Sequence, residues 1–488
     1  MTSFPIAAGR LFIDNRWTES STGETFPVHN PATEGEVVRV ASASEADVDR
    51  AVASARKAFD DGPWRRLSPA DRGKLMFKMA ELLLKYRDEM AYRETVCTGK
   101  PISDTTNIDV SVSSWVWEYY GGWTTKIHGE TLPVHGNHLN YTLKEPLGVV
   151  AAIPAFNFPL LMSAWKMGPA IAAGNTVVLK PSPHAPLSAL KLAELALEAG
   201  FPPGVINVIT GQDPLVGRAL VRHPGVDMVA FTGSTETGRN IMRDGADTLK
   251  RLSLGLSAKS PTIVFADADV EAAAARTCFG LFYNVGQVCG GNARVLVEER
   301  AHDRFLSALV REAAAWAPGD PLKPETKVGP VAHRKQFDRV MGYLKLGPEE
   351  GAKVVHGGGR ADVRGDGKGY FIQPTVFDGV RPQMRISKEE IFGPVLSVIT
   401  FNSEEDALRI ANDNMYGLAG SIWTNDVTRA HSIAKRLRAG IVWINTYHVY
   451  DPASPFGGVK ESGFGKELGP HALDSFLQTK SVWVNMEK

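Results

Sequence analysis

Gly148-Val149-Val150-Ala151-Ala152-Ile153 is an almost wholly apolar run, and it begins the most regular part of the sequence. Similar apolar runs follow at 175–179, 205–209 and 228–231, and they alternate with helical patterns at 159–173, 187–199 and 213–221. Nearly continuous apolar strands separated by helices indicate a parallel sheet that is covered on both faces. We therefore predict an α/β chain with a doubly wound sheet of the nucleotide-binding kind, although periodicity alone does not identify the ligand.

The sequence on either side of this region predicts further parts. A second α/β pattern starts at Pro261 and runs to about Gly457. Residues 44–97 have the capping residues and apolar spacing of helices. Residues 123–145 resemble an extended hairpin, and residues 475–484 a further strand. Protruding strands commonly pair between subunits, so we expect an oligomer.

The composition excludes several classes of protein. A chain of 488 residues should form two or three domains, and 43% hydrophobic with 22% charged residues is typical of a globular protein. Lys plus Arg and Asp plus Glu are balanced at 54 each, so we expect no nucleic-acid or membrane partner. The sequence shows no signal-peptide pattern, no apolar run of membrane-spanning length and no cysteine pairing pattern, which together predict a cytoplasmic location. The histidines show no metal-ligand spacing, so we expect no metal.

One of the three cysteines has the surroundings of a nucleophile. Cys97 and Cys278 lie in apolar helical patterns and are predicted to be buried. Cys289 lies instead among Gly286, Gly290 and Gly291, where backbone and substrate can come close. A thiol reacts as the thiolate, so we expect a polar, open setting that lowers the pKa of Cys289.

A glycine-containing turn follows the last strand of the first pattern. Phe231-Thr232-Gly233-Ser234-Thr235-Glu236-Thr237-Gly238 joins a strand to a helix, and the first amides of a helix can bind phosphate. Its glycine spacing is not the usual one, so alone it is a weak signal. Lys180 stands at the carboxyl end of another strand, where ligands of such sheets bind. Together the two features favour a nucleotide.

At this point the sequence resembles the aldehyde dehydrogenase family over nearly its whole length. The matching blocks, in chain order, are Phe156–Pro159, Gly174–Ser182, Phe231–Gly238, Gly286–Cys289, Glu389–Pro394 and Pro455–Gly458. The resemblance implies a homodimer or homotetramer with three parts, which are a nicotinamide cofactor domain (1–122 and 146–257), a catalytic domain (258–469) and a bridging element (123–145 and 470–488).

The resemblance also implies the chemistry and the residues that perform it. Cys289 attacks the aldehyde to form a thiohemiacetal and then a thioester, while Asn157 and the Cys289 amide hold the oxyanion. The residues implied at the cofactor, NAD or NADP, are Ile153, Pro154, Lys180, Ser182, Pro183, Gly233, Ser234, Leu256, Gln336, Glu390 and Phe392. Those implied at the substrate are Phe158, Met162, Trp165, Val288, Gly290, Tyr450 and Phe456. This wall is apolar and aromatic, so we expect an uncharged hydrophobic or aromatic aldehyde.

Two positions depart from the family pattern. Pro183 stands where NAD-preferring members have a glutamate that binds the ribose hydroxyls and repels a 2′-phosphate. We expect NAD to be used and NADP to be accepted more readily than usual. Gly255 stands where hydrolytic members have the glutamate that acts as general base, and Ser257 and Ala258 replace two glycines of the same loop. Loss of a general base typically costs about 10²–10⁴-fold in rate.

Three explanations of Gly255 remain open on the sequence. Glu467 could act as the substitute base through a water. The thioester could instead be passed to coenzyme A, as in acylating members of the family. The chain could also bind cofactor and aldehyde while turning over slowly or not at all. The first explanation corresponds to NAD(P)-dependent oxidation of an aldehyde to a carboxylic acid, which is the predicted function.

Overall fold

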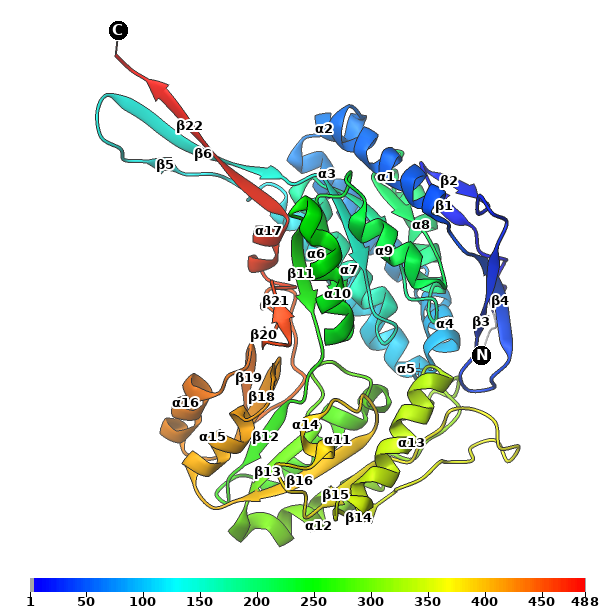
Figure 1. Ribbon diagram of the computed structural model, residues 1–488, viewed down its shortest axis with the longest axis vertical. Helices are drawn as coiled ribbons and strands as arrows, with labels where there is room; N and C mark the ends of the chain where they lie inside the picture. The colour runs from blue at the N-terminus through cyan, green and yellow to red at the C-terminus, as the bar shows by residue number, and fades with distance from the viewer. Residues whose placement is uncertain (1–3, 488) are drawn as a thin grey trace.

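The computed structural model describes residues 4–487, and two large sheets carry most of its helices (Figure 1). The first sheet has eight strands, in the spatial order β2 (Arg16–Thr18), β1 (Leu11–Ile13), β9 (Ile206–Val208), β8 (Thr176–Leu179), β7 (Val149–Ile153), β10 (Met228–Thr232), β11 (Arg251–Gly255) and β21 (Gly463–Phe464). The run from β9 to β11 is parallel, as the alternation of strands and helices predicted.

Helices cover both faces of this sheet because successive strand residues point to opposite sides. Val150 and Ala152 of β7 belong to one apolar core, whereas Val149 and Ala151 belong to another. The helices that contribute to these two cores are α1 (Glu45–Asp60), α3 (Pro69–Lys85), α4 (Arg87–Thr98), α6 (Ser111–Trp123), α7 (Pro159–Ala173), α8 (Leu187–Ala199), α9 (Pro214–Arg222) and α10 (Thr235–Gly245). The short helices α2 (Pro63–Arg66) and α5 (Ile102–Asp104) and the hairpin of β3 (Thr25–His29) and β4 (Glu36–Ala41) complete this part.

The second sheet lies below the first in Figure 1 and has seven strands. Their spatial order is β14 (Lys353–His356), β15 (Thr375–Asp378), β16 (Val395–Phe401), β13 (Arg294–Glu298), β12 (Pro261–Val264), β18 (Ala419–Trp423) and β19 (Ile441–Ile444), all parallel except β14. Its helices are α11 (Val270–Phe282), α12 (His302–Ala313), α13 (Arg334–Glu349), α14 (Arg385–Lys388), α15 (Glu404–Asn412) and α16 (Val427–Arg436). Strands β17 (Tyr416–Gly417) and β20 (Val459–Lys460) form a small pair beside it.

A third, antiparallel sheet extends away from the rest of the chain (Figure 1). It consists of β22 (Leu477–Asn485), β6 (His138–Pro146) and β5 (Thr131–Leu132), and α17 (His471–Ser475) leads into it. The hairpin and the terminal strand expected from the sequence are therefore both present, and they pair with each other.

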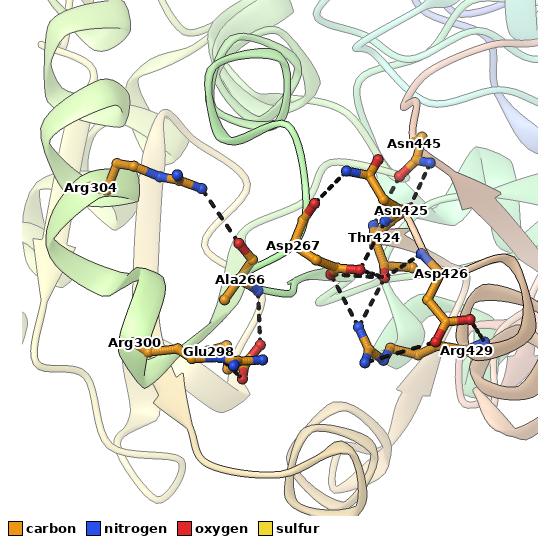
Figure 2. Close-up of polar contacts among 10 residues, drawn as sticks. All are labelled: Ala266, Asp267, Glu298, Arg300, Arg304, Thr424, Asn425, Asp426, Arg429 and Asn445. Atoms are coloured by element: carbon orange, nitrogen blue, oxygen red, sulfur yellow. Dashed lines mark hydrogen bonds and ion pairs between the residues drawn. The ribbon is translucent and has the colours of Figure 1, made fainter.

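Hydrogen bonds join the carboxyl ends of the strands in the second sheet (Figure 2). The Asp267 carboxylate follows β12 and accepts bonds from the Thr424 hydroxyl and the Asn425 amide, which follow β18. Arg429 of α16 donates to the same carboxylate, and Asn445 after β19 exchanges two bonds with the backbone of Thr424. These bonds fix how β12, β18 and β19 end relative to one another. No helix among residues 4–487 is long and apolar enough to cross a membrane.

Candidate active site

A cleft of about 1310 Å³ opens at the carboxyl ends of β7, β8 and β10. Residues from the start of α13 and from the segment after α14 form its other wall, so both large sheets contribute to it. Every residue predicted to contact the cofactor lines this cleft, namely Ile153, Pro154, Lys180, Ser182, Pro183, Gly233, Ser234, Leu256, Gln336, Glu390 and Phe392. Asn157 and Cys289 line it as well.

One end of the cleft has the properties of an anion site. Ser234 caps α10 by accepting a hydrogen bond from the Thr237 amide, and the positive end of the α10 dipole faces the cleft there. Lys180 is buried, and its Nζ has only the carbonyls of Pro181 and Gly211, at 3.5 and 3.4 Å, as hydrogen-bond acceptors among the described residues. Burial lowers the pKa of Lys180 to about 8. A buried ammonium group without a carboxylate fits an anionic ligand such as a dinucleotide.

Two histidines of the cleft were missed by the sequence reasoning. His184 follows β8 and His333 caps α13, and their rings stack with centroids 4.0 Å apart. Phe156 packs edge-on against both rings. Burial lowers the pKa of His184 to about 4 and that of His333 to about 3, so both rings are neutral at pH 7. No local pattern could have paired them, because they come from opposite walls of the cleft.

The opposite end of the cleft is held by Glu390 and Gln336. A carboxylate oxygen of Glu390 accepts a hydrogen bond from the Ala258 amide at 2.8 Å. The side-chain amide of Gln336 donates to the carbonyls of Ile391 and Phe392 at 2.9 and 2.8 Å. Gln336 therefore positions the segment that carries Glu390 and Phe392, which is a role the sequence did not predict.

The backbone before Cys289 is held in an unusual conformation. Asn284, Val285 and Gly286 have φ values of 47°, 51° and 74°, and a β-branched residue such as Val285 rarely adopts such a value. A Cβ atom on Gly286 would overlap the backbone carbonyl of Gly393. Position 286 thus requires glycine, and its close approach joins the Cys289 segment to the segment of Glu390 and Phe392. Strain of this kind persists only where the surrounding structure enforces it.

Asn157 lies beside this segment and is fixed by it. Its side-chain amide donates to the Gln287 carbonyl at 2.9 Å, and the Asn284 amide donates to the Asn157 carbonyl at 3.0 Å. The side-chain oxygen of Gln287 accepts from the Ala332 amide, so that side chain supports the loop. Asn157 keeps one N–H for a further acceptor.

The environment of Cys289 corrects one expectation from the sequence. Cys97 and Cys278 are buried as predicted, and Cys289 is partly exposed at the cleft. However, burial of its thiol, with the nearby Glu467 charge as the next cause, raises the pKa of Cys289 to about 12. The expectation of a lowered pKa was wrong because the glycines around Cys289 bring apolar side chains and a carboxylate close to the sulfur. Without cofactor the residue is a neutral thiol at pH 7, so it needs a base.

Glu467 lies near both Cys289 and Gly255. Gly255 ends β11 in an ordinary strand conformation, and a Cβ on it would lie 3.9 Å from Oε2 of Glu467 and 3.3 Å from Oγ1 of Thr232. Glu467 forms an ion pair with Lys166 of α7, whose Nζ also donates to the Thr232 hydroxyl at 2.6 Å. Glu467 is itself mostly buried. Its carboxylate therefore occupies the region into which a side chain at position 255 would extend.

Aromatic residues gather on the other side of Cys289. Trp165 contacts Phe456, which contacts Tyr450, with ring centroids 5.0 and 5.7 Å apart. A Cβ on Gly290 would lie 2.9 Å from the Tyr450 hydroxyl, so the glycine leaves room here. Phe158 is the N-cap residue of α7, and Met162 and Val288 are buried. Tyr283 and His448, which the sequence reasoning missed, complete this group of side chains.

No group of three or more His, Cys, Asp or Glu residues within 4–487 could hold a metal ion.

Comparisons with known proteins identify the family to which the chain is similar. A sequence model described as the aldehyde dehydrogenase family matches residues 17–482. An aldehyde dehydrogenase of Alternaria alternata is 47% identical over 477 residues, which cover 98% of this chain and 95% of that protein. The NAD+ complex of an aldehyde dehydrogenase from Bacillus cereus superposes with a TM-score of 0.96 at 45% identity, covering 98% of this chain and 97% of that one. AldA, the indole-3-acetaldehyde dehydrogenase of P. syringae in complex with NAD+ and IAA, gives a TM-score of 0.97 at 44% identity, covering 99% and 97%.

Proposed function

The chain belongs to the aldehyde dehydrogenase family, and from that premise we propose which residues carry out its NAD(P)-dependent aldehyde oxidation and which aldehydes it accepts. The observation that carries the proposal is the position of Cys289, since it lies in the same cleft as Asn157, Glu390 and Phe392. Cys289 is the nucleophile, and the substrate is an uncharged hydrophobic or aromatic aldehyde. The family relationship does not favour acyl transfer to coenzyme A or a non-catalytic role.

The side chains of the cleft suit each step. The Cys289 sulfur bonds to the aldehyde carbon and its proton goes to a base, which gives a thiohemiacetal. The free N–H of Asn157 and the Cys289 amide stabilise the negative oxygen, and such donors are typically worth ~3 kcal/mol each. The cofactor that this cleft would hold between Ser234, Glu390 and Phe392 would supply the acceptor for the hydride that leaves the same carbon. Water then cleaves the resulting thioester, releasing the carboxylic acid and restoring the thiol.

We assign the base to Glu467. Its carboxylate is close enough to Cys289 for its charge to raise the thiol pKa, and it lies beside the position that Gly255 leaves without a side chain. Lys166 forms an ion pair with it. Thr232, which shares Lys166 with Glu467, lines the cleft, so a water between Thr232 and Cys289 could pass its proton to Glu467. Glu467 thereby takes the role of the absent glutamate.

The cofactor wall supports the use of both NAD and NADP. Pro183 adds no charge beside the buried Lys180, which is free to interact with a phosphate. Arg218 and Arg222, which share Asp244 as their partner, also line this part of the cleft. The B. cereus relative was solved with bound NAD+, which supports NAD as the preferred cofactor of this chain.

The P. syringae relative is named for indole-3-acetaldehyde, which supports an aromatic aldehyde as the substrate of this chain.

We also propose that the chain divides into three parts and assembles into a homodimer or homotetramer through the third. The parts are residues 1–122 with 146–257, residues 258–469, and residues 123–145 with 470–488. The three free cysteines support a reducing, cytoplasmic location.

A pre-steady-state experiment tests this proposal. Enzyme, NAD or NADP and an aromatic aldehyde are mixed, and reduced nicotinamide is followed by absorbance. We expect a burst of up to one equivalent followed by steady turnover, and no burst in Cys289→Ala. Acceleration of the steady phase by coenzyme A would favour the acylating alternative, and absence of both phases would contradict the assignment of Cys289.

A further inference from the structure

Six aromatic side chains contact one another in series beside the nucleophile, and we call this series the aromatic circuit. Consecutive ring centroids lie 6.1 Å apart for Phe158 and Tyr283, 6.3 Å for Tyr283 and His448, and 5.7 Å for His448 and Tyr450. Tyr450 contacts Phe456 and Phe456 contacts Trp165, as described above. Phe158 and Trp165, the two ends of this series, belong to one helix, since Phe158 is the N-cap residue of α7 and Trp165 lies about two turns further on.

Cys289 lies at the edge of this circuit. A Cβ on the next residue, Gly290, would lie 2.9 Å from the Tyr450 hydroxyl and 3.9 Å from Nε2 of His448. These two polar atoms are therefore the nearest side-chain atoms on the outer side of the nucleophile segment. An aldehyde bonded to the sulfur has its remaining atoms next to them.

Three polar atoms of the circuit are buried without a partner. Nε2 of His448, the Tyr283 hydroxyl and Nε1 of Trp165 make no hydrogen bond with any residue in the range 4–487. Buried polar groups are normally paired, and leaving them unpaired is costly. Three of them on one aromatic circuit, next to the reactive residue, indicate that a ligand supplies their partners.

The kind of ligand group follows from the donors and acceptors available. Burial lowers the pKa of His448 to about 3, so its imidazole is neutral and can either donate or accept one hydrogen bond. Trp165 can only donate, and a tyrosine hydroxyl can do both. The Lys100 ammonium lies 3.6 Å from the centroid of the Phe158 ring, but it is paired with the buried Asp109 carboxylate at 2.6 Å. It is therefore already neutralised, and the circuit offers no free cation to a carboxylate or phosphate on the substrate. A hydroxyl group matches every one of these atoms, because it donates and accepts.

We infer that the substrate is an aromatic aldehyde that carries a hydroxyl group, and that His448 selects it because Nε2 accepts a hydrogen bond from that hydroxyl. This rests on the proposed function, and it narrows the aromatic aldehydes to hydroxylated ones. His448 acts in specificity and takes no part in the bond changes at Cys289.

Steady-state kinetics with matched aldehydes test the inference. Benzaldehyde, its three hydroxy isomers and the corresponding methoxy isomers are compared by kcat/KM. One hydroxy isomer should exceed benzaldehyde by about tenfold or more, because a site built to bind a hydroxyl leaves its polar atoms unpaired with the analogue that lacks one. The methoxy isomer should lose most of that gain, since it cannot donate.

Variants at position 448 locate the effect. His448→Leu should reduce the ratio of the two kcat/KM values to within about threefold of one, and His448→Gln should restore part of it because its amide can still form the bond. The control is His431→Leu, which changes an exposed histidine of α16 and should keep the wild-type ratio.

A wild-type enzyme that oxidises benzaldehyde and all hydroxy isomers equally would overturn the inference without any variant, and so would a full preference retained in His448→Leu. Oxidation of no aldehyde at all would instead contradict the proposed function. If His448→Leu fails to fold, the kcat/KM ratios of the wild-type enzyme and of His448→Gln still test the inference.

Discussion

Glu467 has two opposite effects on the reactivity of Cys289. The carboxylate charge raises the thiol pKa, which disfavours the thiolate, yet the same carboxylate is the base that we assign to the reaction. A buried thiol with a pKa of about 12 is protonated at pH 7, so proton removal has to accompany attack. At the scale of single residues, activity should therefore depend on Glu467 even though its charge disfavours the thiolate.

Glu467→Gln should separate these two effects. We expect kcat to fall about 10²-fold, as is usual on loss of a general base, and the burst of reduced nicotinamide to become slower, because the attacking thiol also loses its proton acceptor. Alkylation of Cys289 by iodoacetamide without cofactor should become faster at a fixed pH near 8. Removal of the negative charge lowers the pKa of the Cys289 thiol below its wild-type value of about 12. A larger fraction of the thiol is then ionised at pH 8.

The control for this variant is Glu405→Gln, an exposed glutamate of α15 that pairs with Arg436. It should change neither rate, since exposed ion pairs contribute little. A kcat in Glu467→Gln within a factor of two of wild type would refute the role of Glu467 as base.

Gly255→Glu tests whether position 255 and Glu467 serve one purpose. The site admits a Cβ with only a small shift of Thr232, at 3.3 Å, and the longer side chain then requires the side chain at position 467, whose carboxylate oxygen lies 3.9 Å from that Cβ, to move aside. We expect little gain in the wild type, where Glu467 already acts, and recovery of at least about tenfold of the lost kcat in the Glu467→Gln background. Gly255→Gln in that background supplies bulk without a base and should recover nothing. Equal recovery by both variants would mean that position 255 acts by packing.

Pro183→Glu tests the cofactor wall. A carboxylate there should pair with Lys180 and repel a 2′-phosphate, so kcat/KM for NADP should fall relative to NAD by about tenfold or more. Pro183→Gln is the neutral control and should change the ratio much less. The measurement is kcat/KM for each cofactor. An unchanged ratio of the NADP value to the NAD value in Pro183→Glu would show that no phosphate binds near this residue.

At the scale of elements, strand ends place both the site and its support. The carboxyl ends of β7, β8 and β10 line the cleft, as parallel sheets generally dictate. The corresponding ends in the second sheet hold the network around Asp267 instead (Figure 2). Its polar groups bind one another, so this end serves stability.

Asp267→Ala should destabilise the protein without changing the active site. It removes the acceptor used by Thr424, Asn425 and Arg429, at a cost of about 1–3 kcal/mol, and the midpoint of thermal unfolding should fall. Asp267→Asn keeps an acceptor, so its midpoint of thermal unfolding should fall less. The exposed Asp247 provides the control, because Asp247→Ala should leave the midpoint unchanged. An unaffected midpoint in Asp267→Ala would show that the network contributes nothing to stability.

At the scale of the whole molecule, the three-stranded sheet is the part least accounted for within one chain. Strand β22 lies at its edge, and Leu143 and Trp483 are large apolar side chains exposed by 41% and 58%. A long exposed edge strand normally pairs with something. A second copy of the chain fits, because a self-complementary edge forms a symmetric pair.

Leu143→Glu combined with Trp483→Glu should therefore reduce the oligomer to smaller species in light scattering. Charges that face each other across a two-fold interface repel and are costly to bury. Val427→Glu changes an exposed valine of α16 and should leave the mass unchanged. A monomeric wild-type protein at micromolar concentration would contradict the assembly.

The sequence predicted the alternation of strands and helices between residues 148 and 231 and the buried state of Cys97 and Cys278, and its family resemblance gave the cofactor candidates that line the cleft but not His184 or His333. Apolar periodicity is a local property, and the family motifs stand in contiguous blocks, so both can be read without coordinates. The tertiary structure decided the pKa of Cys289, the position of Glu467 beside Gly255, and the circuit that contains Tyr283 and His448. Each of these depends on groups distant in the chain that folding brings within a few ångströms, and burial and charge act through space.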